Sequence, residues 1–111
     1  MGHSETERRA IEYVMQLERG QGRQPTDVHH AGAPYDVDSP PRKIEVKAFG
    51  GSARGAAIPI EDRQARAARE DPENFYLHVV DNVSRADEGL MRVRVLHGER
   101  LTVIMIAANR C

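Results

Sequence analysis

Apolar residues recur with two different periods along the chain, and each change of period predicts a change of element. The first pattern has helical spacing and lies between two capping signals. Ser4 and Glu7 have the spacing of a capping box at its start, and Gly20 follows its end. We therefore expect a helix over about residues 5–18, with an apolar stripe of Ala10, Ile11, Val14, Met15 and Leu17.

Alternation of apolar and polar residues predicts the strands. The clearest case begins at Ile44, where Ile44, Val46 and Ala48 share one face of the expected strand. Its opposite face carries Glu45 and Lys47. The expected strands are residues 24–31, 35–38, 44–49, 75–81 and 90–96, and a second helix is expected at 61–69.

The order of these elements predicts the fold class. One helix, three strands, a second helix and two strands indicate an α/β (α+β) fold, with a central mixed sheet flanked by helices. The length of 111 residues suits a single domain, 1–111. The apolar run 101–107 fits either a buried strand or the start of a helix, and an exposed run would be a dimer contact.

Composition places the chain among soluble globular proteins. Apolar residues make up 40% and charged residues 30% of the sequence. No run approaches the roughly 20 apolar residues that cross a bilayer, and the N-terminus has no apolar signal region. We therefore expect a cytoplasmic protein without membrane contact. The lone Cys111 excludes an internal disulfide and a cysteine-rich zinc site.

Polar residues around the third strand carry the candidate chemistry. A Ser39-Pro40-Pro41 break lies between Asp36 and Glu45, which predicts two neighbouring strands joined by a tight turn. That turn would bring the two carboxylates together. Oxygen ligands of this kind suit Mg²⁺ or Mn²⁺, and Lys47 beside them would favour an attacking water at a phosphodiester. Alternatively, Glu45 and Lys47 are only the solvated face of an edge strand.

Four motifs extend this pattern into a family resemblance. The Asp36 and Glu45-Val46-Lys47 pair resembles the PD-(D/E)XK nuclease superfamily and, within it, the NO VEIN C-terminal-like domain. The resemblance covers roughly residues 8 to 81. Its motifs, in chain order, are Ala10-Ile11-Glu12, Pro34-Tyr35-Asp36-Val37, Ile44-Glu45-Val46-Lys47 and Tyr76-Leu77-His78-Val79-Val80.

The resemblance implies a restriction-endonuclease-like sheet and metal-dependent cleavage of DNA. Asp36 and Glu45 would bind the metal, the Val46 carbonyl would be a third ligand, and Lys47 would assist the water. Glu12 would complete the metal shell, although it could equally pair with Arg8 at the border of its helix. Two positions depart from the pattern. Pro34 replaces a Gly, and Gln64 stands where that group tends to carry a Glu.

Charge gives mixed support to a nucleic-acid function. The net charge is −1, although 14 of the 16 basic residues are arginine. Arg54, in the small-residue loop 49–57, is one candidate phosphate contact, and the alternative is a flexible loop tip. Arg63 and Arg66 with Arg69 form a basic strip on the second helix, which could also be a solvated face. Gln64 would point towards the site from the same helix.

Two histidines and two classes of function complete the sequence prediction. His29 and His30 are adjacent, so only one of them would approach the site, and a surface position is the alternative. We expect either a Mg²⁺ or Mn²⁺ dependent endonuclease or a non-catalytic binding or assembly module of a DNA-processing or defence complex. DNA, a second copy of the chain or a larger protein would be the partner. A third alternative is an unrelated α+β protein in which the E-x-K triplet is accidental.

Overall fold

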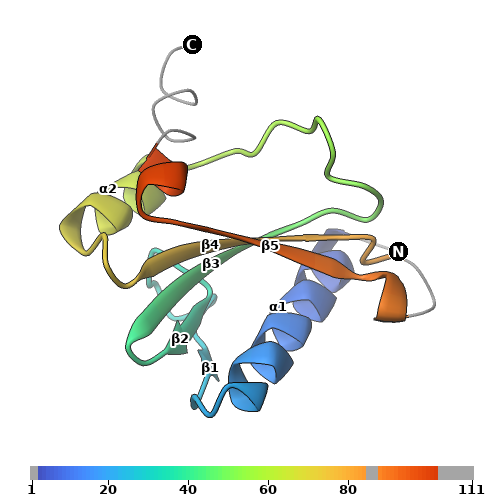
Figure 1. Ribbon diagram of the computed structural model, residues 1–111, viewed down its shortest axis with the longest axis horizontal. Coiled ribbons are helices and arrows are strands. Elements are labelled where there is room, and N and C mark those ends of the chain that lie inside the picture. Colours follow the sequence, from blue (N-terminus) through green and yellow to red (C-terminus); the bar gives the residue numbers. More distant parts are fainter. Residues whose placement is uncertain (1–2, 85–87, 103–111) are drawn as a thin grey trace.

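The computed structural model describes residues 3–84 and 88–102 as a five-stranded sheet with helices on both faces (Figure 1). This confirms the expected α+β class and the order of the main elements. In chain order they are α1 (His3–Gly20), β1 (Thr26–Asp27), β2 (Val37–Ser39), β3 (Arg42–Ala48), α2 (Asp62–Glu70), β4 (Phe75–Asp81), the 3₁₀ helix η1 (Glu88–Leu90) and β5 (Arg92–His97).

The sheet is mixed, and its strands lie side by side in chain order. β1, β2 and β3 are antiparallel to one another, β3 and β4 are parallel, and β5 is antiparallel to β4. The parallel pair needs a crossover, which contains α2. Glu45 on β3 is in register with Leu77 on β4, and Leu77 is in register with Leu96 on β5.

Each face of the sheet has its own hydrophobic cluster. Ile44 and Val46 of β3 pack towards α1, together with Ile11 and Val14 of that helix. Leu77 and Val79 of β4 pack on the other face, which is covered by α2 and the long connection before it (Figure 1). The alternation predicted for β3 is therefore confirmed, and Glu45 and Lys47 lie on the α2 face.

The connection between β3 and α2 is tied to the sheet at its beginning. Backbone hydrogen bonds of 2.8–3.1 Å join residues 49–51 to residues 82–84. A Cβ added to Gly50 would come within 2.6 Å of Ser84 Oγ, so a larger residue there would require the Ser84 hydroxyl to move. The start of this loop is thus fixed by the sheet rather than being a free tip.

Two strand predictions are wrong in their extent. The expected strand 24–31 is reduced to Thr26–Asp27, because the Asp27 side chain accepts a hydrogen bond from the His29 backbone N–H and turns the chain. The strand expected at 35–38 begins only at Val37. A turn follows it at Pro40-Pro41, as predicted, and a cis peptide bond joins these two residues.

The C-terminal apolar run is described only in part. Residues 99–102 are helical, and the Thr102 N–H donates a 3.0 Å hydrogen bond to the Gly98 carbonyl. Leu101 is buried against the α2-side cluster. The rest of the run 101–107 lies outside the described residues. No helix in the described part of the chain has the length and apolar character that crossing a membrane requires.

Candidate active site

Asp36 is held against the edge of β3 by hydrogen bonds to and from the backbone. Its N–H donates to the Ile44 carbonyl at 2.9 Å, and its Oδ2 accepts from the Val46 N–H, also at 2.9 Å. Asp36 lies one residue before β2 begins, and its carboxylate replaces the backbone carbonyl that would otherwise accept the Val46 N–H hydrogen bond in the sheet. Because the N–H and C=O of one strand residue point to the same side, the Val46 carbonyl faces this edge as well.

Glu45 and Lys47 meet Asp36 on the α2 side of β3. Lys47 Nζ lies 3.2 Å from Glu45 Oε2, and both side chains are largely buried, at 14% and 6% exposure. A side-chain hydrogen bond joins the carboxyl groups of Glu45 and Asp36. The fold-back predicted from the Ser-Pro-Pro break therefore brings all three side chains together.

Burial raises the pKa values of both carboxyl groups, and the charge of Asp36 raises that of Glu45 further. Burial raises the pKa of Glu45 to about 8, the Asp36 charge acts in the same direction, and Lys47 opposes them. Burial also raises the pKa of Asp36, against the hydrogen bond from Val46, and the charge of Glu7 adds to the rise. Two close carboxyl groups of this kind hold one proton between them near neutral pH.

Gln64 connects the start of α2 to this cluster. Its Nε2 donates a 2.7 Å hydrogen bond to Glu45 Oε2, and its Oε1 accepts from Lys47 Nζ at 3.0 Å. The same oxygen accepts from the Glu61 backbone N–H at 3.1 Å, so the amide is also part of the helix cap. The predicted direction of Gln64 towards the site is confirmed.

The acid of α1 that borders the site is Glu7, not Glu12. Glu7 lines the same cavity as Asp36 and Glu45. Glu12 points elsewhere, is 54% exposed, and lies 3.7 Å from Arg19. It lies about 100° around the helix from the inward-facing Ile11, which takes it out of the face that meets the sheet. The expectation that Glu12 completes a metal shell is therefore wrong in position, and so is its expected pairing with Arg8.

The carboxyl pair lines two cavities. One, of about 480 Å³, lies beside Lys47 and Glu7. The other, of about 190 Å³, is bordered by His29 and Arg63. His29 Nδ1 contacts Asp27 Oδ1, and this hydrogen bond raises the pKa of His29. His29 is therefore the one of the two adjacent histidines that approaches the site. Asp27, which the sequence analysis did not single out, holds it in place.

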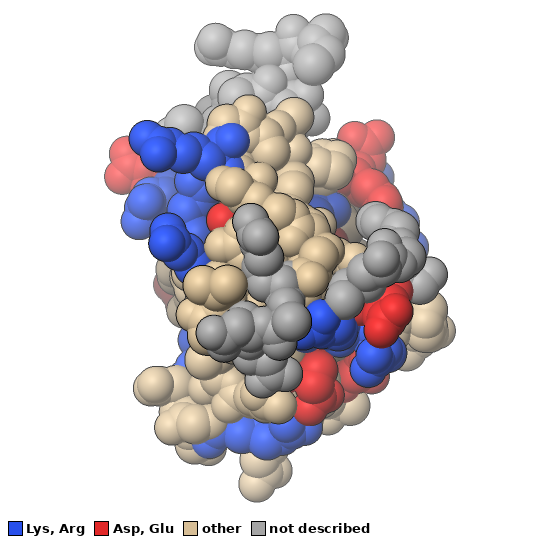
Figure 2. Space-filling model, turned by 90° about the vertical axis from the view of Figure 1, so that its right-hand side faces the viewer, with Lys and Arg blue, Asp and Glu red and all other residues tan. Residues whose placement is uncertain are grey.

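The predicted nucleic-acid contacts do not all lie near this pair. Arg63 does, and it donates a hydrogen bond to the Gly32 carbonyl. Arg66 is exposed on α2 and lines neither cavity, whereas Arg54 lines a separate cavity above β4 and β5. On the face seen in Figure 2, basic side chains gather at the upper left while both signs mix below. Positive charge is therefore concentrated locally despite the net charge of −1.

The donor set suits a hard divalent cation that keeps some of its water. Among the residues that the structure describes, no three His, Cys, Asp or Glu side chains converge in the geometry of a metal site. Mg²⁺ typically needs only one or two carboxylates, with water and substrate oxygens completing its octahedron. Asp36, Glu45 and the Val46 carbonyl are the oxygen donors gathered here.

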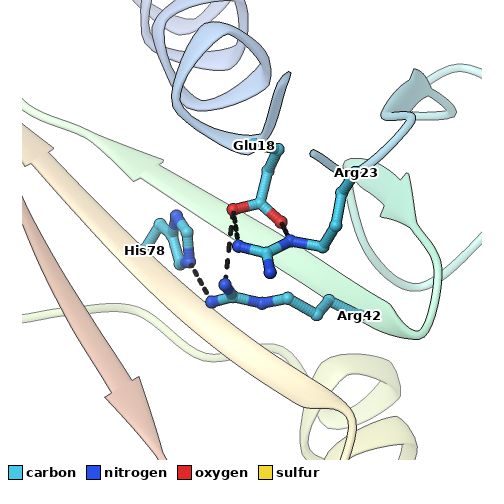
Figure 3. A network of polar contacts seen from close by, with 4 residues as sticks. All are labelled: Glu18, Arg23, Arg42 and His78. Atoms are coloured by element: carbon cyan, nitrogen blue, oxygen red, sulfur yellow. Dashed lines mark hydrogen bonds and ion pairs between the residues drawn. The ribbon is translucent and has the colours of Figure 1, made fainter. Parts of the chain in front are cut away.

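A second polar cluster lies on the opposite face of the sheet, under the C-terminal end of α1 (Figure 3). Arg23 makes two hydrogen bonds to the buried Glu18, of 2.6 and 3.0 Å, and Arg42 reaches the same carboxylate at 3.3 Å. Arg42 also contacts His78 Nε2 at 3.2 Å. These contacts tie the end of α1 to β3 and β4, so the cluster holds the fold together rather than forming a second site.

Protonation in this cluster follows from its burial and charges. Burial lowers the pKa of His78 to about 4, and the neighbouring Arg42 charge adds to the effect. Burial alone would raise the pKa of Glu18, but the hydrogen bond from Arg23 and the Arg42 charge outweigh it and lower the pKa. At neutral pH the network therefore contains a charged Glu18 and a neutral His78.

Comparison with known families identifies the chain. Residues 6–94 match the family described as Protein NO VEIN, C-terminal. The chain belongs to this family. No curated protein matches it, and no solved structure matches it. The range shared with the NO VEIN C-terminal family contains the site from Glu7 to Gln64 and extends to Arg94 on β5.

Proposed function

We propose that this protein is a Mg²⁺ or Mn²⁺ dependent endonuclease with a PD-(D/E)XK type of active site, acting on DNA phosphodiester bonds. One observation carries the proposal: Asp36, Glu45 and Lys47, from two adjoining segments of the sheet, line one open cavity. The two carboxyl groups are close enough to share a hydrogen bond, and the ammonium group lies 3.2 Å from one of them.

The carboxyl pair would hold the ion through oxygens that the protein has already positioned. The Val46 N–H holds one oxygen of Asp36, while Gln64 and Lys47 hold one oxygen of Glu45. These contacts fix the direction of both carboxyl groups towards the cavity, with the Val46 carbonyl beside them. A bound divalent ion would supply charge for the phosphate oxygens and lower the pKa of a bound water.

Lys47 is the residue placed to assist that water. Hydrogen bonds from its ammonium group to Glu45 and Gln64 restrict its position, and its charge favours a hydroxide near the carboxyl pair. In the reaction a water oxygen attacks phosphorus and the bond to the leaving sugar oxygen breaks. Glu7 lines the same cavity as Asp36 and would add a further negative charge beside a bound ion.

Gln64 favours a second candidate function. Its amide engages both Glu45 and Lys47, which are the two groups that catalysis requires to act on metal and water. The net charge of −1 also gives little general attraction to DNA. Under this alternative the domain is a non-catalytic binding or assembly module of a DNA-processing or defence complex.

A cleavage assay separates the two candidates. Supercoiled plasmid and labelled oligonucleotides are incubated with Mg²⁺, Mn²⁺, Ca²⁺ or a chelator. We expect cleavage with Mg²⁺ or Mn²⁺ but not with Ca²⁺ or the chelator. The cleavage rate of Lys47→Ala should fall by at least about 100-fold, in line with the loss of one transition-state charge contact. Glu12→Gln is the matched control and should cleave like the natural chain. Absence of cleavage under every condition, with the protein folded, favours the non-catalytic module.

A further inference from the structure

We infer that Arg92, Arg94 and Arg54 form a phosphate-binding subsite for the polynucleotide strand, separate from the carboxyl pair. These arginines line a cavity of about 520 Å³ between the β3–α2 connection and the strands β4 and β5. The sequence analysis named Arg54 as a candidate phosphate contact, but it did not name Arg92 or Arg94 of β5. The inference rests on the proposed function for the position of the scissile phosphate.

The register of the sheet aligns this cavity with the catalytic lysine. Lys47 on β3 is the partner of Val79 on β4, and Val79 is the partner of Arg94 on β5. Partners in adjacent strands share a face, so all three side chains lie on the α2 side. Two strand spacings separate Lys47 from Arg94, which corresponds to roughly 10 Å between their Cα atoms.

That separation suits the repeat of a nucleic-acid strand. Phosphates along one strand of a duplex advance by about 3.4 Å along the axis, so roughly 10 Å corresponds to about three nucleotides. A strand with its scissile phosphate at Lys47 would therefore bring a later phosphate to Arg94. Its path would pass outside the β3–α2 connection, because Val79 is buried beneath that connection. Arg92, two residues along β5, continues the same face.

The charges of the cavity favour an anion. Its three arginines are exposed, and guanidinium groups bind phosphate oxygens in a bidentate way. Asp81 is the acid of the cavity lining, and its Oδ2 accepts a 3.2 Å hydrogen bond from the Ala53 N–H. Asp81 thereby holds the β3–α2 connection against the sheet beside Arg54. Three positive side chains against one negative leave the cavity positive.

Binding measured without metal tests this subsite independently of catalysis. A fluorescent 20-nucleotide DNA, single-stranded or as a duplex, is titrated in chelator with the full chain. We expect Arg92→Gln/Arg94→Gln to weaken binding at least tenfold. The loss of two phosphate contacts should also reduce the salt-dependence slope for the single strand by about 1.4.

Two double variants with the same loss of charge serve as controls. Arg8→Gln/Arg19→Gln removes exposed arginines of α1 and should change affinity less than twofold. Arg66→Gln/Arg69→Gln tests the α2 strip and should have a smaller effect than the β5 pair. Arg92→Lys/Arg94→Lys keeps the charge but loses the bidentate contacts, so its affinity should lie between those of the natural chain and Arg92→Gln/Arg94→Gln. Thermal unfolding verifies that each variant is folded.

The outcomes separate this inference from the proposed function. Arginine-dependent DNA binding without any metal-dependent cleavage supports the subsite and contradicts the nuclease. Cleavage with unchanged binding in Arg92→Gln/Arg94→Gln overturns the subsite alone. The subsite is also overturned when the natural chain binds no DNA, when all double variants lose affinity equally, or when polyglutamate competes as well as the oligonucleotide.

Discussion

Gln64 Nε2, in the first turn of α2, donates a 2.7 Å hydrogen bond to Glu45 Oε2 in the middle of β3. The same amide accepts from Lys47, so one neutral side chain connects both charged groups of the E-x-K element. The family resemblance of the sequence implies a glutamate at this position. The site is therefore built with an amide where a third carboxylate would be expected.

Substitution Gln64→Glu should convert this position into a metal ligand. A third carboxylate beside Glu45 adds an oxygen donor and negative charge, so Mn²⁺ affinity should rise by about tenfold or more. Without metal the added repulsion should lower stability by roughly 1 kcal/mol. Calorimetric titration and thermal unfolding measure the two effects. Weaker Mn²⁺ binding in this variant would indicate that Gln64 is not adjacent to a cation.

Substitutions Glu7→Gln and Glu12→Gln form a matched pair on one helix. The charge of Glu7 helps raise the pKa of Asp36, and Glu7 lines the cavity, so its loss should weaken Mn²⁺ binding about threefold to tenfold. Glu12 is exposed and should have no effect. Titration of both variants with Mn²⁺ measures this difference. A larger loss of Mn²⁺ affinity in Glu12→Gln than in Glu7→Gln would show that Glu12 is the acid of α1 that contributes to the site.

The pKa of Glu45 predicts an unusual pH dependence of stability. A carboxyl group whose pKa is raised from 4.5 to about 8 stabilises the fold below pH 4.5, and this contribution is lost as pH rises through 8. The natural chain should therefore be less stable at pH 9 than at pH 6, by an amount on the order of 2 kcal/mol.

The substitution Glu45→Gln should remove most of that difference. Urea unfolding at pH 6 and pH 9 provides the measurement, and Mn²⁺ should restore stability at pH 9 only in the natural chain. Equal pH profiles for the two proteins would show that Glu45 ionises normally.

The network beneath α1 predicts loss of stability in acid. His78 has its pKa lowered to about 4 from 6.5, so its contribution is present above pH 6.5 and is lost as pH falls towards 4. Glu18, with a lowered pKa, adds a further loss below 4.5. Glu18→Gln at pH 7 should cost about 3 kcal/mol, because it leaves buried arginine charge uncompensated.

The exposed pair of Glu12 and Arg19 provides the control for this network. Glu12→Gln should cost less than about 1 kcal/mol. Urea unfolding of both variants gives the comparison. Similar costs for Glu18→Gln and Glu12→Gln would mean that the buried network contributes little.

The sequence predicted the centre of the site because its signals are local. Alternation places Glu45 and Lys47 on one face, and the Ser-Pro-Pro turn brings Asp36 to the neighbouring edge. Glu12 was chosen by resemblance, whereas helical spacing from the buried Ile11 leads back four residues to Glu7. Both inward-facing acids of α1, Glu7 and Glu18, could have been found by extending its apolar stripe at each end.

Other features depend on long-range pairing that no local pattern contains. The alignment of Lys47 with Arg94 across Val79 requires the strand order and register of the sheet. The contact of Asp27 with His29 requires β1 to end early, where a longer strand had been expected. The buried Glu18 and His78 and the partly buried Arg42 come from three separate elements, so their meeting appears only in the folded chain.

Diffraction from crystals grown with Mn²⁺, recorded with the anomalous signal of manganese, tests the central claim most directly. We expect one strong peak about 2.2 Å from a carboxylate oxygen of Asp36 and of Glu45, near the Val46 carbonyl. The peak should be absent in Glu45→Gln crystals grown in the same way. A manganese ion bound elsewhere, or the carboxyl pair still sharing its hydrogen bond at saturating Mn²⁺, would contradict the proposed metal site.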